Sequence, residues 1–219
     1  MKRPLLQVAL DNLSLEDALD SLKSGVDEVV DIIECGTILI GAEGKRVIGL
    51  VRKLYPDKLL VADFKIADSG RVMGGMILDG HPDLMTVICS AHPSTMKAVL
   101  DEIKDRGMNT EVQLELYGNW TFEDVETWKA MGLRHVILHH ARDIKGGWSK
   151  EEVALTKKLC DAGMKVTVTG SIGYDDLELF RGLPVWCIIC GRSIRDAADP
   201  KAEAQRMKDR LVELWEDHE

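Results

Sequence analysis

The stretch LVADFKIADSG, residues 60–70, places two carboxylates and an ammonium group within a few positions, directly after an apolar run. Asp63 and Lys65 are two residues apart, so on a regular strand both side chains would point to the same face. An unpaired buried charge is strongly unfavourable. The two residues are therefore either a structural ion pair or part of a site that uses both charges, and residues 60–70 alone leave both interpretations open.

Apolar runs that are typical of buried strands recur along the chain, and a helical pattern follows each of them. The runs are residues 5–11, 28–36, 58–65, 84–90, 111–116, 135–140, 165–170 and 185–191. Three of the helices begin at a capping residue, Ser14, Thr121 or Ser149, with an acidic residue three positions later. Strands alternating with helices indicate a parallel sheet, and this number of units fits a closed (β/α)8 barrel, a TIM barrel. Because no linker divides the chain, we expect one domain over residues 1–219.

Composition and charge narrow the possible function classes. The formal net charge is −9 and no basic face stands out, which argues against a nucleic-acid partner. No apolar run approaches the roughly 18 residues that a membrane span needs. The N-terminal stretch reaches Asp11 too early for a signal-peptide core, so we expect a cytoplasmic protein. An acidic chain can still bind a phosphorylated small molecule, because one arginine and a few backbone amides hold a phosphate locally.

The five cysteines are an odd number and lie mostly in apolar runs, which indicates reduced, buried thiols. Cys187 and Cys190 form the motif CIIC inside a predicted strand. Residues three apart on a strand face opposite sides, so a redox or zinc site is disfavoured there.

Polar residues end nearly all of the predicted strands, and functional residues in a barrel of this kind lie at the C-terminal ends of the strands. The candidate site residues at or just after these ends are Asp11, Glu34, Asp63, Lys65, Glu115, His139, Arg142, Thr169, Ser171 and Arg192, together with Gly170 and Gly191, whose small size lets backbone amides approach a ligand. One strand-end carboxylate is more often a loop cap than a catalyst. So many polar ends converging on one mouth are difficult to explain as caps alone, and we predict a single polar site there.

Local chemistry suggests roles for these residues. Glu34 and Asp63 supply the hard oxygen ligands that Mg²⁺ prefers, with water and substrate completing its coordination. Lys65, beside that negative charge, would stay protonated and could stabilise a developing oxyanion. The residues after strands seven and eight occupy the usual phosphate position of these barrels. Glu115 and His139, with Arg142, form a second polar group suited to moving a proton or orienting a water molecule.

The motif DFKIAD has the Asp-x-Lys-x-x-Asp pattern of the orotidine monophosphate decarboxylase superfamily, and the chain resembles its 3-keto-L-gulonate 6-phosphate decarboxylase branch. The likeness covers nearly the whole chain, in order, through LQVALDN, DIIECGT, ADFKIADSG, TVICSA, QLELYGNWT, KVTVTG and CGRSIRDAADP. The resemblance implies a carboxy-lyase that depends on a metal ion, Mg²⁺. Its substrate would be the sugar phosphate 3-keto-L-gulonate 6-phosphate, converted to L-xylulose 5-phosphate and CO₂ through a cis-enediolate.

Carried over by position, the resemblance also implies residue roles. Glu34 and Asp63 would bind Mg²⁺, Asp11 would contact substrate, and Lys65 would stabilise the enediolate. Asp68 would reach the active site of the partner subunit in a homodimer with shared active sites.

The remaining site residues fall into two groups by the same resemblance. Glu115, His139 and Arg142 would position the water that delivers the proton. The phosphate would be bound, mostly through backbone amides, near Thr169, Gly170, Ser171, Gly191 and Arg192. Ser171 departs from the family, which usually has a second glycine there; the difference matters little unless the backbone needs a positive φ.

Three alternatives stay open. The sibling 3-hexulose-6-phosphate synthase adds formaldehyde to ribulose 5-phosphate through a similar enediolate, but tends to differ at Glu115, Arg142 and Thr169, where this chain has the decarboxylase residues. A Schiff-base aldolase would need a neutral Lys65, which the flanking carboxylates disfavour. A non-catalytic sugar-phosphate binding protein is the third.

Overall fold

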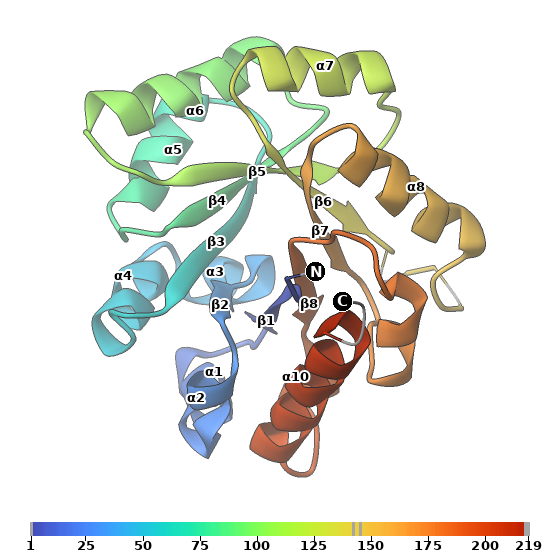
Figure 1. The fold of residues 1–219 in the computed structure, drawn as a ribbon. Helices are drawn as coiled ribbons and strands as arrows, with labels where there is room; N and C mark the ends of the chain where they lie inside the picture. The colour runs from blue at the N-terminus through green and yellow to red at the C-terminus, as the bar shows by residue number, and fades with distance from the viewer. Residues whose placement is uncertain (1, 142, 145, 217–219) are drawn as a thin grey trace.

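Eight parallel strands close into a barrel in chain order, each hydrogen-bonded to its sequence neighbours and β8 to β1 (Figure 1). The computed structural model describes residues 2–141, 143–144 and 146–216. The strands are β1 (Leu5–Leu10), β2 (Ile32–Cys35), β3 (Leu59–Ile66), β4 (Leu84–Ile88), β5 (Glu111–Leu116), β6 (His135–His139), β7 (Lys165–Thr169) and β8 (Cys187–Cys190). The predicted (β/α)8 TIM barrel is confirmed.

Helices surround the barrel on its outside (Figure 1). They are α1 (Leu15–Ser21), α2 (Asp27–Val29), α3 (Thr37–Glu43), α4 (Arg46–Leu54), α5 (Gly70–Leu78), α6 (Pro93–Asp105), α7 (Phe122–Ala130), α8 (Lys150–Asp161), α9 (Arg192–Arg195) and α10 (Pro200–Glu216), with a π-helical segment η1 (Leu22–Val26) and a 3₁₀ helix η2 (Asp175–Phe180). Among the described residues, no helix is both long and apolar enough to cross a membrane.

The predicted helix starts are correct, and one strand boundary is not. The side chains of Ser14, Thr121 and Ser149 each accept a hydrogen bond from the backbone N–H three residues on, and the latter two form complete capping boxes. The predicted strand 28–36 begins too early, because Asp27–Val29 is still helical and the strand starts only at Ile32. Val29 faces the core from this helix and Val30 from its C-cap, and a short apolar run cannot distinguish such an arrangement from a strand.

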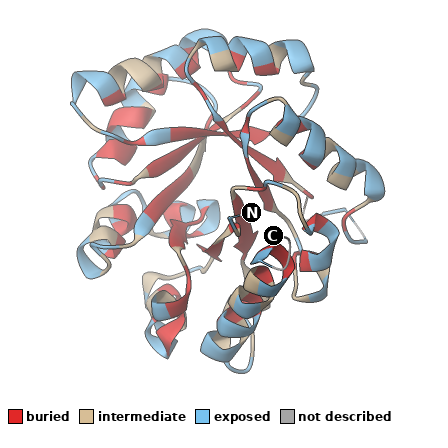
Figure 2. Ribbon diagram, in the orientation of Figure 1, coloured by how far each residue is buried: buried red, intermediate tan, exposed pale blue. Residues whose placement is uncertain are grey.

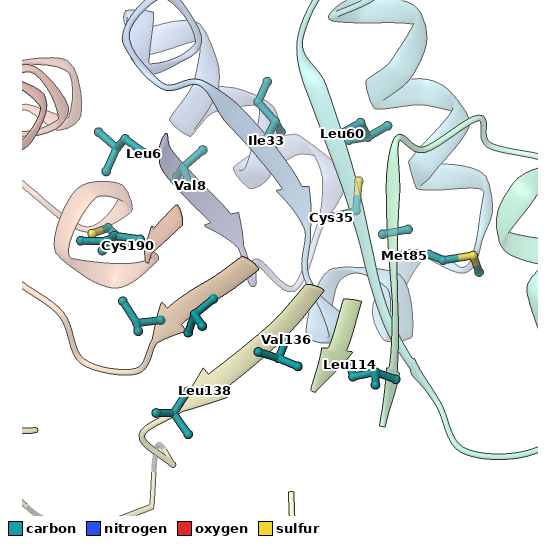
Figure 3. Packing of buried hydrophobic residues seen from close by; sticks show 14 of the residues in the cluster. Leu6, Val8, Ile33, Cys35, Leu60, Met85, Leu114, Val136, Leu138 and Cys190 are labelled. Atoms are coloured by element: carbon teal, nitrogen blue, oxygen red, sulfur yellow. The ribbon is translucent and has the colours of Figure 1, made fainter. Parts of the chain in front are cut away.

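Two layers of apolar side chains hold the barrel together, and the strands are buried on both faces (Figure 2). The inner layer fills the barrel with Ala9, Ile32, Val61, Leu84, Ile137, Cys187 and Ile189. The outer layer lies between strands and helices, and part of it, including Leu6, Val8, Ile33 and Cys190, is drawn in Figure 3. Cys187 and Cys190 thus lie in different layers, as predicted from their spacing, and all five cysteines are free thiols.

Strand β3 departs from regular geometry at the residues of the DFKIAD motif. Ala62 pairs with Met85 and Ile66 with Val87, so between these two pairs β3 contains two more residues than β4. Lys65, inside this irregularity, has a φ of +54°. Asp63 and Lys65 point into the same cavity and their side chains meet, as predicted, but they do so from an irregular stretch of β3 and not through simple strand alternation.

Candidate active site

The C-terminal ends of the strands surround a cavity of about 470 Å³. The predicted site residues that line it are Asp11, Glu34, Asp63, Lys65, Glu115, His139, Thr169, Gly170, Ser171, Gly191 and Arg192. The structure therefore brings together residues that lie near or just after the C-terminal ends of β1, β2, β3, β5, β6, β7 and β8.

Two predicted site residues, Asp68 and Arg142, are not among the described residues that line this cavity. Asp68 lies after β3 and lines a separate, more open depression together with residues of the starts of α5 and α6. Its side chain does not line the cavity of its own subunit. Arg142 lies outside the described residues.

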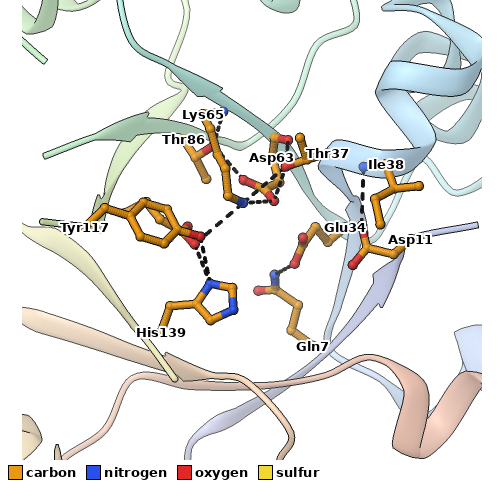
Figure 4. A network of polar contacts seen from close by, with 11 residues as sticks. Gln7, Asp11, Glu34, Thr37, Ile38, Asp63, Lys65, Thr86, Tyr117 and His139 are labelled. Atoms are coloured by element: carbon orange, nitrogen blue, oxygen red, sulfur yellow. Dashed lines mark hydrogen bonds and ion pairs between the residues drawn. The ribbon is translucent and has the colours of Figure 1, made fainter. Parts of the chain in front are cut away.

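Asp63 and Lys65 form the centre of a polar network (Figure 4). The Lys65 ammonium donates to Asp63 Oδ2 and lies 3.5 Å from Glu115 Oε1. Thr37 Oγ1 donates to Asp63 Oδ2 at 2.8 Å, and Thr86 Oγ1 donates to Asp63 Oδ1 at 2.8 Å. Each oxygen of this buried carboxylate therefore accepts at least one hydrogen bond, which holds the side chain in one orientation.

The charge state of Lys65 follows from this network. Burial alone would lower the pKa of Lys65, but the negative charges of Asp63 and Glu115 outweigh it and raise that pKa above its ordinary value. The lysine is therefore an ammonium group at the edge of the cavity, suited to stabilising negative charge that develops there.

Glu34 is a buried carboxyl group close to other carboxylates. Its side chain is 6% exposed, and Gln7 Nε2 donates a hydrogen bond to its Oε2. Burial, followed by the charges of Asp63 and Asp11, raises the pKa of Glu34 well above its usual range.

A hard divalent cation fits this group of carboxylates, because it would offset their mutual repulsion with oxygen ligands of the kind it prefers. The described residues contain no cluster of three or more potential His, Cys, Asp or Glu ligands around one metal position. Glu34 and Asp63 are the two carboxylates that would hold such an ion, since Mg²⁺ takes one or two carboxylates and keeps water or substrate in its other positions.

Glu115, His139 and Tyr117 form a second polar group. His139 and Tyr117 lie apart from Glu34 in Figure 4. His139 Nδ1 lies 2.8 Å from Glu115 Oε1 and 3.1 Å from Tyr117 Oη. Because Glu115 also contacts the Lys65 ammonium, it joins the two polar groups into one.

The loop after β7 begins with two residues that have positive φ. Gly170 and Ser171 have φ values of +106° and +53°, and a Cβ on Gly170 would lie 2.0 Å from the His140 carbonyl oxygen. Trp148 Nε1 donates to the Gly170 carbonyl at 2.9 Å, and Ser193 Oγ of α9 donates to the Ile172 carbonyl at 2.8 Å. The second bond connects the loop after β7 to α9. Ser171 thus occupies the positive φ region in which the family's usual glycine is favoured.

Several residues of the site were missed by reasoning from the sequence. They are Gln7, Thr37, Thr86 and Tyr117, which contact the predicted residues but do not themselves stand out. Strand alternation offers a signal for one of them, because Tyr117 follows Glu115 by two positions. The partners Gln7, Thr37 and Thr86 come from β1, α3 and β4, and only the closed barrel brings them close to the predicted residues.

Comparison with known proteins agrees with this geometry. Residues 4–207 match the model of the Orotidine 5'-phosphate decarboxylase / HUMPS family. The chain is 43% identical over 218 residues, covering 98% of it and 100% of the relative, to the 3-keto-L-gulonate-6-phosphate decarboxylase UlaD of Escherichia coli O17:K52:H18.

Solved structures are similar over the same length. KGPDC from Streptococcus mutans, solved as a complex, has a TM-score of 0.93 and 38% identity, covering 97% of this chain and 99% of that one. The 3-keto-L-gulonate-6-phosphate decarboxylase from Vibrio cholerae has a TM-score of 0.88 and 32% identity, covering 98% and 100%. The chain belongs to the Orotidine 5'-phosphate decarboxylase / HUMPS family.

Proposed function

We propose that this protein is a carboxy-lyase that converts 3-keto-L-gulonate 6-phosphate into L-xylulose 5-phosphate and CO₂. The observation that carries the proposal is the Lys65 ammonium, which faces the cavity between Asp63 and Glu115. Decarboxylation of a β-keto acid leaves an electron pair that a neighbouring carbonyl must accept as an oxyanion. A protonated lysine beside that oxygen would stabilise the anion.

The two ends of the substrate suit the two sides of the cavity. The sugar phosphate would place its phosphate at the turn of Gly170 and Ser171 and at the start of α9, where Gly191 and Arg192 line the cavity. Asp11, at the end of β1, would accept hydrogen bonds from substrate hydroxyl groups. The reacting carbons would then lie near Lys65.

Magnesium is part of the proposal, with Glu34 and Asp63 as the residues that would hold it. The ion, when bound, would act as a Lewis acid on the substrate oxygens that gain negative charge. Thr37 and Thr86 orient the Asp63 carboxylate, and Gln7 orients that of Glu34.

The chemistry divides into two steps that use different residues. The bond between the substrate carboxylate and C2 breaks, CO₂ leaves, and the electron pair remains as a cis-enediolate beside Lys65. C2 then takes a proton on the side of the cavity where Glu115 and His139 lie, and this protonation gives the ketose product. By family resemblance, Arg142 would belong to the same proton-delivering group.

We also propose a homodimer with shared active sites. Asp68 lines a depression outside the cavity of its own subunit, so it is available to a second subunit. In that arrangement its carboxylate would complete the partner's site.

The test is CO₂ release from 3-keto-L-gulonate 6-phosphate, measured with Mg²⁺ and with a chelator. Metal-dependent release supports both reaction and cofactor. No release from folded protein would contradict the proposal, and formaldehyde with ribulose 5-phosphate would then test for the synthase reaction. Borohydride with substrate should trap no adduct, because a protonated Lys65 does not form a Schiff base.

A further inference from the structure

Tyr117 contacts His139 but is not among the residues that line the cavity. It comes directly after β5, and its ring lies next to the His139 ring, with centroids 5.8 Å apart. The Tyr117 hydroxyl and the Glu115 carboxylate both contact Nδ1 of the imidazole, so the other ring nitrogen, Nε2, takes part in neither contact (Figure 4).

The contacts at Nδ1 determine which ring nitrogen carries the fixed proton. An ionised carboxylate only accepts hydrogen bonds, so the 2.8 Å distance from Glu115 Oε1 requires Nδ1 to be the donor. The Tyr117 oxygen, 3.1 Å from the same nitrogen, then shares that N–H as a second acceptor. With Nδ1 protonated, Nε2 is left as the nitrogen that can gain or lose a proton.

Tyr117 is itself held in place. Its backbone N–H donates to Cys89 Sγ at 3.3 Å, and the Cys89 thiol donates to the Tyr117 carbonyl at 3.1 Å. Burial, followed by the charge of Glu115, raises the pKa of Tyr117 well above its ordinary value, so the hydroxyl stays neutral. A neutral, fixed hydroxyl beside an imidazole restricts ring rotation without adding charge.

We propose that Tyr117 is a positioning residue for proton delivery: with Glu115 it fixes the Nδ1 proton of His139 and thereby presents Nε2 to the substrate. This inference rests on the proposed decarboxylation. After CO₂ leaves, the enediolate carbon takes the proton from Nε2 of an imidazolium, directly or through one water molecule. His139 is left neutral with Nδ1–H still bound to Glu115 and Tyr117, and solvent returns the proton to Nε2.

The kinetic test is the variant Tyr117→Phe, which removes only the hydroxyl. We expect kcat to fall about 10-fold with KM changed less than about twofold, because the group acts on proton transfer and not on binding. Tyr55→Phe, a matched loss of a hydroxyl at the end of α4, should leave both parameters unchanged. Wild-type kcat in Tyr117→Phe would overturn the inference.

A double-mutant cycle separates positioning from a general structural effect. In a His139→Ala background, Tyr117→Phe should lower kcat by less than about twofold, because the hydroxyl acts only through His139. If the losses multiply instead, Tyr117 acts by another route and the inference is wrong.

NMR of protein labelled with ¹⁵N in its histidine rings gives a readout that needs no substrate. The resonances missing from His139→Ala identify His139. We expect the Nδ1-protonated tautomer in both proteins, because Glu115 remains as the acceptor, but exchange-broadened His139 ring signals in Tyr117→Phe, where the hydroxyl no longer restricts the ring. Ring signals as sharp in Tyr117→Phe as in wild type would overturn the inference. If wild type forms no product at all, the proposed function fails, whereas an active wild type with equally sharp His139 signals in Tyr117→Phe refutes only the role of Tyr117.

Discussion

The Lys65 ammonium contacts the Asp63 carboxylate from a backbone conformation with φ of +54°, in the left-handed region. For a residue other than glycine this conformation costs roughly 1–2 kcal/mol. The backbone N–H of Lys65 donates to Thr86 Oγ1 at 2.8 Å, and the same hydroxyl donates to Asp63. Thr86 therefore fixes both the Lys65 backbone and the Asp63 carboxylate. Strain kept in place by a third residue is typical of functional sites.

Lys65→Ala should therefore remove activity more than stability. We expect kcat for CO₂ release to fall about 100- to 1,000-fold, because the positive charge beside the developing oxyanion is lost. Lys104→Ala, on the exposed face of α6, is the matched control and should behave as wild type. Retained turnover in Lys65→Ala with a native circular dichroism spectrum would place catalysis elsewhere.

Glu34→Gln should stabilise the metal-free protein and inactivate it. Because burial and the nearby carboxylates raise the pKa of Glu34, folding at pH 7 either leaves an unfavourable buried charge or requires uptake of a proton. We expect Tm in the presence of chelator to rise by about 2–4 °C, the shift that 1 kcal/mol gives in a chain of this size. A lower Tm would show that the ionised carboxylate is stabilised by groups other than a cation.

Gly170→Ala should damage the turn after β7. The new Cβ would lie 2.0 Å from the His140 carbonyl oxygen, so the backbone must move. We expect the free energy of unfolding to fall by at least about 2 kcal/mol and KM to rise. Gly132→Ala has the same kind of positive φ but no atom within 4 Å of its Cβ, so urea unfolding should show only the conformational cost of about 1 kcal/mol.

Asp31 should contribute measurably to the loss of folding stability at acid pH. Burial alone would raise its pKa, but hydrogen bonds from Arg3, the Leu6 backbone and Lys208 lower the pKa of Asp31 to about 2. A lowered carboxyl pKa adds stability above the unfolded value of 3.8, and this contribution is lost as the pH falls toward 2. Between pH 7 and pH 3, wild type should lose about 1 kcal/mol more than Asp31→Asn in urea titrations. Equal losses in both proteins would show that the ion pairs at Asp31 add no net stability.

The order of strands and the position of most site residues could be predicted because both follow from local patterns. Asp11, Glu34 and His139 each lie at or just beyond the end of an apolar run, and parallel strands necessarily bring such ends to one mouth. The same reasoning placed Glu115 correctly. It also predicted a protonated Lys65, which the raised pKa of that lysine bears out. It could not predict the raised pKa of Glu34, which depends on how closely the closed barrel packs the carboxylates.

What could not be predicted depends on backbone detail or on contacts between distant strands. The irregularity around Lys65 arises where β3 pairs with β4, and nothing in DFKIAD indicates it. Ser171 adopts a positive φ that its residue type disfavours. Thr37 and Thr86 are ordinary helix and strand residues in the sequence, and only the fold brings their hydroxyls to Asp63.

The most direct test of the central claim follows ¹³C in the substrate by NMR, in D₂O. With wild-type protein and Mg²⁺, 3-keto-L-gulonate 6-phosphate labelled at its carboxylate should release labelled CO₂, and the L-xylulose 5-phosphate formed should carry one deuterium at C1. Both signals should vanish with chelator or in Lys65→Ala. An unchanged substrate resonance with folded wild-type protein, or product without deuterium, would contradict decarboxylation through an enediolate at this site.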